Sequence, residues 1–440
     1  MSRLLFALAL SVPSVAADWP QWMGPTRDGV WAETGLLDTL PAGGPKKLWS
    51  VPVGGGYGGP AVAGGKVYVL DYQKAGGDAT NNPAKRATLT GRERVLCLDA
   101  KTGKELWQRA YDCPYKVSYP AGPRCTPTVS GGVVYALGAM GDLLALDAAT
   151  GAVKWQTDFK KDFDAKPPIW GFSGHPLVHG QLLVCLVGGP EALLVAFDKD
   201  TGKPVWKAGE TGGNGPGYGP PTVVTVNGAA VLVHWNPKHV VGFEPLTGKQ
   251  LWRVPLEPAY GMSIATPVLA GDTLFVGGYT SAALALKLTG GTPTELWRGE
   301  PKKSGLYPVN ASPLVRDGVI YGCDADGQLR AVELATGKRL WGTTRPTQGV
   351  EKEAGDRSAA DATAFLVFAG DRAVLFNEVG ELILAKLSRE GYTELGKAKL
   401  VEPTGEAFGR KVVWSMPAFA GRCVVVRNDN EIACFSLAKD

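Results

Sequence analysis

Two short motifs have the residue types and spacing of metal sites, and both are better explained by strands and turns. His175 and His179 lie four residues apart, which on a helix would bring both imidazoles to one zinc ion. The stretch HPLVHG is typical of a β-strand, however, in which four residues span about 13 Å and one ion cannot reach both rings. Asp324–Gly327 (DADG) resembles the start of a calcium loop but lacks the later ligands, and it joins two apolar runs as a hairpin turn. We therefore predict no metal site and, in the absence of a G-x-S-x-G, H-E-x-x-H or P-loop motif, no catalytic motif.

The sequence instead repeats one phrase, which is the signature of a repeated structural unit. It appears as CLDAKTGKELW at Cys97–Trp107, as ALDAATGAVKW at Ala145–Trp155 and as AFDKDTGKPVW at Ala196–Trp206. The Asp can accept backbone hydrogen bonds within a turn, the Gly supplies a positive φ, and the Trp falls on the following strand, where its ring can pack on a neighbouring unit. The predicted docking residues are Asp99, Gly103, Trp107, Asp147, Gly151, Trp155, Asp198, Gly202, Trp206, Gly248, Trp252, Trp297, Gly337 and Trp341.

Each unit contains four short strand patterns, which predicts the four-stranded antiparallel blade of a β-propeller. Seven outer strands carry a tryptophan, from Trp49 to Trp341, and YTELGKAKL around Leu395 supplies a degenerate eighth. Three strand patterns follow Leu395 without a fourth, and the missing strand is KKLWSV at Lys46–Val51. We therefore predict an all-β fold with eight blades, the last blade being closed by an N-terminal strand so that the ring has no open edge.

The residues just before the first strand of each blade would ring one mouth of the central channel. This predicted ring is rich in aromatic side chains and holds a few polar groups, a composition suited to binding a ligand or partner. Its members are Tyr57, Arg124, Trp170, His175, Tyr218, Tyr260, Asn310, Asp361 and Trp414. The alternative is that these aromatic side chains plug the channel or pack the loops. A polar insertion in the first blade, from Gln73 to Glu93, is expected to be an exposed loop.

The N-terminal residues and the composition of the chain indicate the cellular location of the protein. Residues 1–17 have one positive charge, an apolar run and a small-residue end, which predicts a secretory signal peptide. Residues 18–45 are expected to pack on the propeller, which occupies residues 46–440. No later segment predicts a membrane span. The net charge of +4 is small and scattered, so nucleic acid binding is not expected. We predict a monomeric protein that is periplasmic or secreted.

The seven cysteines cannot all pair with one another, because their number is odd. Cys113 with Cys125, or Cys423 with Cys434, could form a disulfide in an oxidising compartment. The sequence leaves both pairings open.

The repeated form A-x-D-x-x-T-G-x-x-x-W resembles the tryptophan-docking motif of eight-bladed pyrroloquinoline quinone (PQQ)-type propellers. The resemblance covers nearly all of residues 49–440, and DWPQWMGPTRDG at Asp18–Gly29 resembles the amino-terminal signature of secreted bacterial PQQ-binding-like repeat proteins. Quinoprotein alcohol dehydrogenases of this fold bind PQQ and calcium and often carry adjacent cysteines, which this sequence lacks. A second relative, the propeller lipoprotein of the outer-membrane barrel-assembly machinery, is a non-catalytic scaffold, but its lipid-attachment cysteine is missing here.

The resemblance leaves two classes of function open. We predict a non-catalytic binding or scaffold protein for an envelope or extracellular protein, peptide or glycan, without a cofactor. The alternative is a PQQ-dependent oxidoreductase of alcohols or sugars, or a vestigial quinoprotein that keeps only the cofactor pocket. If PQQ and calcium were bound, Asp361 and Asn310 would supply oxygen ligands and Arg124 a guanidinium, with Asp361 as the candidate general base.

Overall fold

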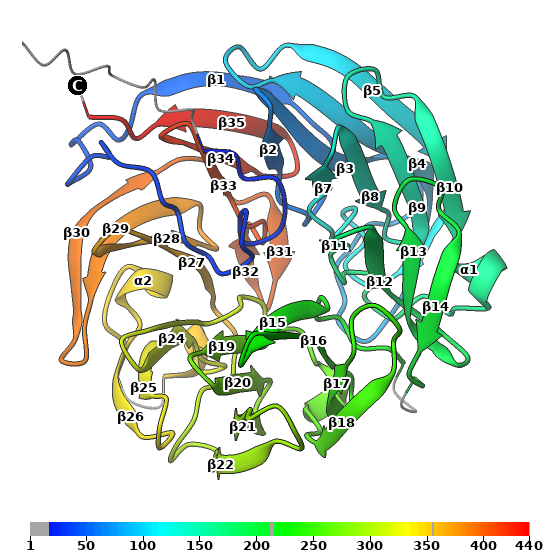
Figure 1. Ribbon diagram of the computed structural model, residues 1–440. Coiled ribbons are helices and arrows are strands. Elements are labelled where there is room, and N and C mark those ends of the chain that lie inside the picture. The colour runs from blue at the N-terminus through cyan, green and yellow to red at the C-terminus, as the bar shows by residue number, and fades with distance from the viewer. Residues whose placement is uncertain (1–16, 212–214, 354–355, 440) are drawn as a thin grey trace, which may run out of the picture.

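The computed structural model describes residues 17–211, 215–353 and 356–439, and these form eight antiparallel sheets arranged as a ring of blades (Figure 1). The predicted eight-bladed propeller is thereby confirmed. The predicted signal peptide, residues 1–17, lies outside the described residues except for its last position. None of the helices in the described ranges has the length and hydropathy needed to cross a bilayer.

The first four blades follow one another along the chain, each running from the channel outward. The first is β2 (Ala61–Ala63), β3 (Lys66–Gly76), β4 (Ala87–Asp99) and β5 (Glu105–Asp112), with β6 (Tyr115–Val117) added to β4; the second is β7 (Thr128–Ser130), β8 (Val133–Leu137), β9 (Asp142–Asp147) and β10 (Val153–Asp158). The third is β11 (Leu177–His179), β12 (Leu182–Gly189), β13 (Ala192–Asp198) and β14 (Pro204–Ala208); the fourth is β15 (Thr222–Val226), β16 (Ala229–Trp235), β17 (His239–Phe243) and β18 (Gln250–Pro255).

The other four blades complete the ring. The fifth is β19 (Val268–Ala270), β20 (Thr273–Gly278), β21 (Ala282–Lys287) and β22 (Thr294–Arg298); the sixth is β23 (Leu314–Arg316), β24 (Val319–Cys323), β25 (Leu329–Glu333) and β26 (Arg339–Thr343); the seventh is β27 (Ala364–Ala369), β28 (Arg372–Asn377), β29 (Glu381–Leu387) and β30 (Tyr392–Lys399). The eighth is β33 (Ala418–Ala420), β34 (Cys423–Arg427), β35 (Glu431–Ser436) and β1 (Lys47–Pro52). Connections hold a hairpin, β31 (Gly405–Ala407) with β32 (Arg410–Val412), and short helices, α1 (Phe159–Phe163), α2 (Arg345–Gln348) and 3-10 turns at Ala259–Gly261 and Arg357–Ala359.

The ring closes as predicted, because β1 pairs antiparallel with β35. Figure 1 shows the blue β1 beside the red β35, so the two ends of the chain share one blade. The middle strands of the blades, such as β8, are buried along their whole length, whereas the outer strand β18 has both exposed and buried residues, which alternate over part of its length. Strands packed between neighbouring blades must be apolar on both faces. The sequences of these middle strands therefore do not alternate between apolar and polar residues.

The repeated phrase forms the corner between the third and fourth strands. In the second blade the Asp147 carboxylate accepts hydrogen bonds from the backbone N–H groups of Ala149 and Thr150 at 3.0 and 2.9 Å, and Gly151 has φ 72°. The tryptophan of the preceding blade lies against that glycine, since a Cβ on Gly151 would come within 2.6 Å of the Trp107 ring. The corner therefore requires glycine for both its φ and its closeness to the ring.

The indole N–H of each of six phrase tryptophans reaches the corner of the next blade. The hydrogen bonds are Trp49 to Ala100 O at 2.9 Å, Trp107 to Ala148 O at 3.3 Å, Trp155 to Lys199 O at 2.9 Å, Trp206 to Pro245 O at 3.2 Å, Trp297 to Leu334 O at 2.7 Å and Trp341 to Ser388 O at 2.9 Å. Trp252 faces the degenerate fifth unit and makes no equivalent bond within the described residues. Each of these six tryptophans thus contacts the next blade through its indole N–H, and the stability that this contact supplies is a prediction tested below.

The segment before β1 crosses one end of the ring. Trp19 forms an antiparallel bridge with Val62 of β2, Val30 forms a parallel bridge with Phe368 of β27, and the Leu37 N–H donates to Leu437 O. In Figure 1 this segment is the dark blue chain that passes over the inner strands.

The expectation of an exposed loop at Gln73–Glu93 is wrong in part. Its flanks extend β3 and β4, so only residues 77–86 connect the strands. Arg86 in this connection donates hydrogen bonds to Pro167 O and Pro168 O, each at 3.0 Å. The insertion therefore forms a longer hairpin whose connecting residues are hydrogen-bonded to the connection between the second and third blades.

All seven cysteines are free thiols, and six of them are buried. Cys113 Sγ lies 4.0 Å from a carboxylate oxygen of Asp142, whereas Cys125 Sγ lies 3.8 Å from Phe172 O, so these two thiols face different groups. Cys423 and Cys434 lie on the neighbouring strands β34 and β35 and their thiols are in contact.

Candidate functional site

All nine residues predicted to ring the mouth line a single cavity of about 650 Å³. They come from eight separate parts of the chain, and each precedes the first strand of a blade. The ring therefore brings together side chains that are up to 357 residues apart, from Tyr57 to Trp414. A cavity of this size accommodates a short peptide segment or a drug-sized molecule and excludes a folded domain.

The floor of the cavity includes Trp22 of the N-terminal segment, a residue that the sequence reasoning missed. The Trp22 ring stacks on His175 with centroids 4.2 Å apart, and its N–H donates to Thr266 Oγ1 at 3.3 Å. His175 Nδ1 accepts a hydrogen bond from the Thr126 N–H at 2.9 Å. Burial, together with the nearby Arg27 guanidinium, holds the pKa of His175 well below its usual value. His175 is thus a neutral, packed side chain and not a proton carrier at neutral pH.

The guanidinium group of Arg124 is hydrogen-bonded to backbone carbonyl groups. Its guanidinium donates to Trp170 O at 2.7 Å, to Ser118 O at 2.9 Å, to Tyr119 O at 2.5 Å and, more closely still, to Gly122 O. It also lies over the Tyr57 ring, with its carbon 5.1 Å from the centroid. An arginine has five N–H groups and at least four of those of Arg124 are directed at the protein, which leaves little capacity for the ligand carboxylate that a bound PQQ would present.

Asp361 differs from Arg124, whose charged group is bound within the protein. The Asp361 carboxylate forms no ion pair with any residue in the described ranges. Burial raises the pKa of this carboxyl, and the Arg410 guanidinium and the Tyr279 hydroxyl offset the rise only in part. The backbone of Asp361 has φ 61°, in the left-handed region. An aspartate tolerates this conformation better than most residues, but it is still a constrained position.

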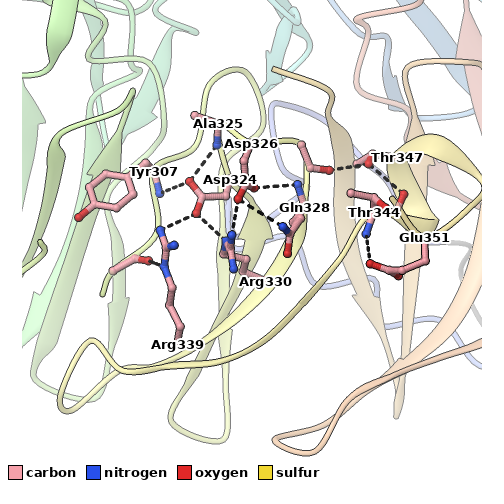
Figure 2. Close-up of polar contacts among 12 residues, drawn as sticks. Tyr307, Asp324, Ala325, Asp326, Gln328, Arg330, Arg339, Thr344, Thr347 and Glu351 are labelled. Carbon is pink, nitrogen blue, oxygen red and sulfur yellow. Dashed lines mark hydrogen bonds and ion pairs between the residues drawn. The ribbon is translucent and has the colours of Figure 1, made fainter. Parts of the chain in front are cut away.

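The Asp324–Gly327 turn contacts the backbone of Asp361, and Figure 2 shows the polar contacts within and around this turn. The Asp324 carboxylate forms ion pairs with the guanidinium groups of Arg330 at 2.7 Å and Arg339 at 2.8 Å. It also accepts a hydrogen bond from the Ala325 N–H at 2.8 Å. The Ala325 carbonyl in turn accepts the Asp361 N–H at 2.9 Å. The motif that resembled a calcium loop is a hairpin turn, as predicted, whose carboxylate is neutralised by two guanidinium groups.

Trp414 is fixed by a buried carboxylate. Glu378 accepts the Trp414 indole N–H at 3.0 Å and pairs with the Arg410 guanidinium at 2.6 Å. Tyr119 and Phe408 lie beside the Trp414 ring, with centroids 5.7 and 6.1 Å away. The charges of Glu378 and Arg410 cancel locally, so this wall of the cavity is aromatic and close to neutral.

The remaining aromatic wall comes from the third, fourth and fifth blades. The Trp170 indole N–H donates to Pro83 O of the first-blade insertion at 3.1 Å, and the Trp170 ring lies 5.1 Å from Tyr218. Tyr260 lies 6.2 Å from Tyr279 and is 82% exposed, which places it at the rim.

Several lining residues were not predicted, because they do not lie directly before a first strand: Tyr119 lies earlier in the connection that holds Arg124, and the others lie in other loops or in the N-terminal segment. They are Tyr119, Tyr279 and Phe408, with Trp22 from the N-terminal segment. Tyr119, Tyr260, Asp361 and Phe408 all have positive φ, and aromatic residues rarely adopt this conformation without a functional or packing reason. Aromatic residues in turns would have been the only signal in the sequence.

Two polar atoms of the cavity lack a hydrogen-bond partner among the described residues. They are the Tyr57 hydroxyl and the side-chain amide nitrogen of Asn310. A buried donor without an acceptor is costly, so a ligand that supplied one would be favoured.

The lining residues do not fit PQQ with calcium. Calcium takes roughly six to eight oxygen ligands, whereas among the described residues that line the cavity Asp361 is the only carboxylate and Asn310 the only amide. Within the described residues no three histidine, cysteine, aspartate or glutamate side chains form a group that could hold a metal ion. Arg124, nominated for the quinone carboxylates, is engaged with carbonyl groups.

Comparisons with known proteins place the chain among propellers of two kinds. A model of the family described as outer membrane protein assembly factor BamB matches residues 34–159, 91–301 and 236–439. BamB of Xanthomonas campestris is 28% identical over 412 residues, which cover 89% of this chain and 86% of that protein. BamB of Yersinia pestis is 26% identical over 226 residues, and the chain spans only 55% of that relative.

A solved structure of quinohemoprotein alcohol dehydrogenase from Comamonas testosteroni superposes with a TM-score of 0.62. The superposition covers 96% of this chain and 81% of that one, at 14% identity. This likeness concerns the fold alone.

Proposed function

The chain belongs to the family described as outer membrane protein assembly factor BamB, and from this premise we propose that it is a non-catalytic binding propeller of the bacterial envelope. It would take part in the assembly of outer-membrane proteins by holding a segment of a partner protein at the channel mouth. The predicted signal peptide supports a periplasmic location.

The observation that carries this proposal is the convergence of the nine predicted mouth residues in one cavity of about 650 Å³. The cavity has an aromatic wall, a floor made in part by Trp22 and two buried polar atoms without partners. Exposed aromatic groups at a concave mouth are typical of a binding site, because they supply a large contact area at a small cost in side-chain entropy. Among the described lining residues, the one serine, Ser173, donates its hydroxyl to Tyr218 O at 3.1 Å and has no histidine or carboxylate hydrogen-bonded to it, which favours binding over catalysis.

The alternative, a PQQ-dependent oxidoreductase, is supported by the fold likeness but not by the lining residues. Titration of the protein with PQQ in the presence of calcium, followed by tryptophan fluorescence, is expected to give no saturable quenching. Saturable binding at micromolar PQQ would favour the oxidoreductase or the vestigial quinoprotein instead.

The proposed function is tested by filling the cavity in cells. Ser173 and Ala84 line it, and Ala84 is exposed at its edge, so the double variant Ser173→Trp, Ala84→Trp should occupy the mouth without disturbing the blades. The matched control is Ala149→Trp, Ala152→Trp at an exposed corner of the second blade. In cells that lack the natural gene, we expect the control and not the mouth variant to restore the amount of folded outer-membrane barrel proteins.

Two results would contradict the proposal. If deletion of the gene leaves the outer-membrane barrel proteins unchanged in amount and folding, the role in their assembly is wrong. If the mouth variant is folded by near-UV circular dichroism and still restores them fully, the mouth is not the binding site.

A further inference from the structure

The carboxylate of Asp361 lies in the wall of an apolar cavity without a cationic partner. No described residue forms an ion pair with it. The two cations whose charges lower its pKa have other surroundings: Arg410 pairs with Glu378 at 2.6 Å, and Arg357 is exposed to solvent. A partly buried carboxylate in such a position is stabilised by any cation that replaces its lost hydration.

Aromatic side chains line the same cavity as this carboxylate. Burial first, and the Asp361 charge second, raise the pKa values of Tyr119 and Tyr279. Tyr260 lies 6.2 Å from Tyr279. Trp414 lies 5.7 Å from Tyr119. The faces of aromatic rings attract cations, and a carboxylate within an aromatic cage is the arrangement that recognises an ammonium or guanidinium group.

The other polar groups of the cavity favour a peptide as the carrier of that cation. The Asn310 amide nitrogen lacks an acceptor, and a peptide carbonyl would supply one. The Arg124 guanidinium, the one cation among the described lining residues, is already bound to carbonyl groups of its own chain, so it has little capacity left for an anionic ligand.

We propose that the cavity binds the side chain of a lysine or arginine in an extended peptide segment of the partner, with the cation at Asp361 and its aliphatic stem along the aromatic wall. This inference rests on the proposed function, since it names the chemical class of the segment held at the mouth. The apolar stem of a lysine or arginine buries well against aromatic rings while its charge stays at the carboxylate.

Blocked tripeptides test this directly with the purified full-length protein. Acetyl-Leu-Lys-Leu-amide carries one cation, and acetyl-Leu-norleucine-Leu-amide keeps the stem without the charge. Binding is measured by calorimetry and by the fluorescence of Trp22, Trp170 and Trp414, which line the cavity. We expect the lysine peptide to bind at least tenfold more tightly than the norleucine peptide.

Asp361→Asn is the matching variant, because asparagine also tolerates the positive φ of this position. Its control is Asp317→Asn, since Asp317 has φ 50° but is exposed in the β23–β24 hairpin outside the cavity. Asp361→Asn should weaken binding of the lysine peptide at least tenfold and leave that of the norleucine peptide unchanged, and Asp317→Asn should change neither.

The pH dependence gives a second measurement. The charged and titratable groups that face Asp361 are Arg410, Glu378, Arg357, Tyr279 and Tyr119. The affinity of the wild-type protein for the lysine peptide should decrease as the pH falls through the raised pKa of Asp361, because protonation removes the charge that binds the cation. In Asp361→Asn this decrease should be absent.

Equal affinity for the two peptides would overturn the inference while leaving the mouth as a binding site for apolar segments. Failure of both peptides to bind at millimolar concentration, or equal losses in Asp361→Asn and Asp317→Asn, would also overturn it. In each case the cell experiment with the filled cavity decides separately whether the proposed function stands.

Discussion

The corners of the blades and the mouth of the channel use the same residue types in opposite ways. At the corner, the Asp147 carboxylate accepts hydrogen bonds from Ala149, Thr150 and the Thr150 hydroxyl, which hold its pKa below the usual value. At the mouth, Asp361 has no ion pair and burial raises its pKa. The corner tryptophan Trp206 is buried against the next blade, whereas Tyr260 at the mouth is 82% exposed.

Under the proposed function, this difference separates the groups that stabilise the fold from the groups that bind a partner. Polar groups that are satisfied within the protein stabilise the ring and have nothing left for a ligand, while groups left unsatisfied lower stability unless something binds them. Arg124 shows that the position of a residue does not decide between these two roles. It lies at the mouth, but its hydrogen bonds are made within the protein, as those of Asp147 are at the corner.

The largest effect is expected at a corner. Trp206 is 8% exposed, donates to Pro245 O and lies within 2.6 Å of the position that a Cβ on Gly248 would take. Trp206→Ala should lower the free energy of unfolding by about 3 to 5 kcal/mol, and Trp155→Ala by less because Trp155 is more exposed. Denaturant unfolding measures both, and an unchanged midpoint for Trp206→Ala would show that the tryptophans do not hold the blades together.

Arg124→Ala should have the next largest effect, a loss of about 2 to 3 kcal/mol, because four carbonyl groups lose a charged donor. Arg124→Lys is the informative control, since it keeps the charge but cannot reach all four carbonyl groups. If Arg124→Ala unfolds like the wild type, Arg124 is free for a ligand and belongs with Asp361.

A smaller loss is expected for Asp147→Ala, which removes one of several equivalent corner carboxylates. Because the folded state lowers the pKa of Asp147, this carboxylate stabilises the protein above the unfolded aspartate pKa of about 3.9, and the contribution is lost as the pH falls through the folded value. Melting temperatures of the wild type and Asp147→Ala should therefore differ at pH 7 and converge below about pH 4. A difference independent of pH would contradict this role of the charge.

The smallest effect on stability is expected for Asp361→Asn. The pKa of Asp361 is raised in the folded state, so its charge destabilises the protein above that pKa, and the cost disappears as the pH falls through it. At pH 7 the melting temperature of Asp361→Asn should equal or slightly exceed that of the wild type. A clear decrease would mean that Asp361 is a structural residue like Asp147.

The fold was predictable because one phrase with fixed spacing repeats around the ring. Asp, Gly and Trp recur at the same corner, and the missing eighth outer strand could be assigned to Lys46–Val51 since a propeller must close; β1 spans Lys47–Pro52. The positions of Tyr57 and Trp414 at one cavity followed from the same logic, because each precedes a first strand.

The chemistry of the site was less predictable, because it depends on loops with no common pattern. Trp22 reaches the floor only through the path of the N-terminal segment, and Phe408 and Tyr119 reach the wall through long connections. Arg124 makes its hydrogen bonds to four backbone carbonyl groups, and the sequence around Arg124 does not predict where these carbonyl groups lie.

The central claim, that the mouth holds a partner and the corners do not, is tested most directly by site-specific crosslinking in cells. A photoreactive phenylalanine analogue replaces Tyr260 at the rim or, as the control, Leu106, which is 47% exposed on the outer strand β5. We predict an adduct with an outer-membrane assembly protein or its substrate from position 260, reduced in the cavity-filled variant, and none from position 106. An adduct from position 106 alone would contradict the account and move the binding surface to the outer edges of the blades.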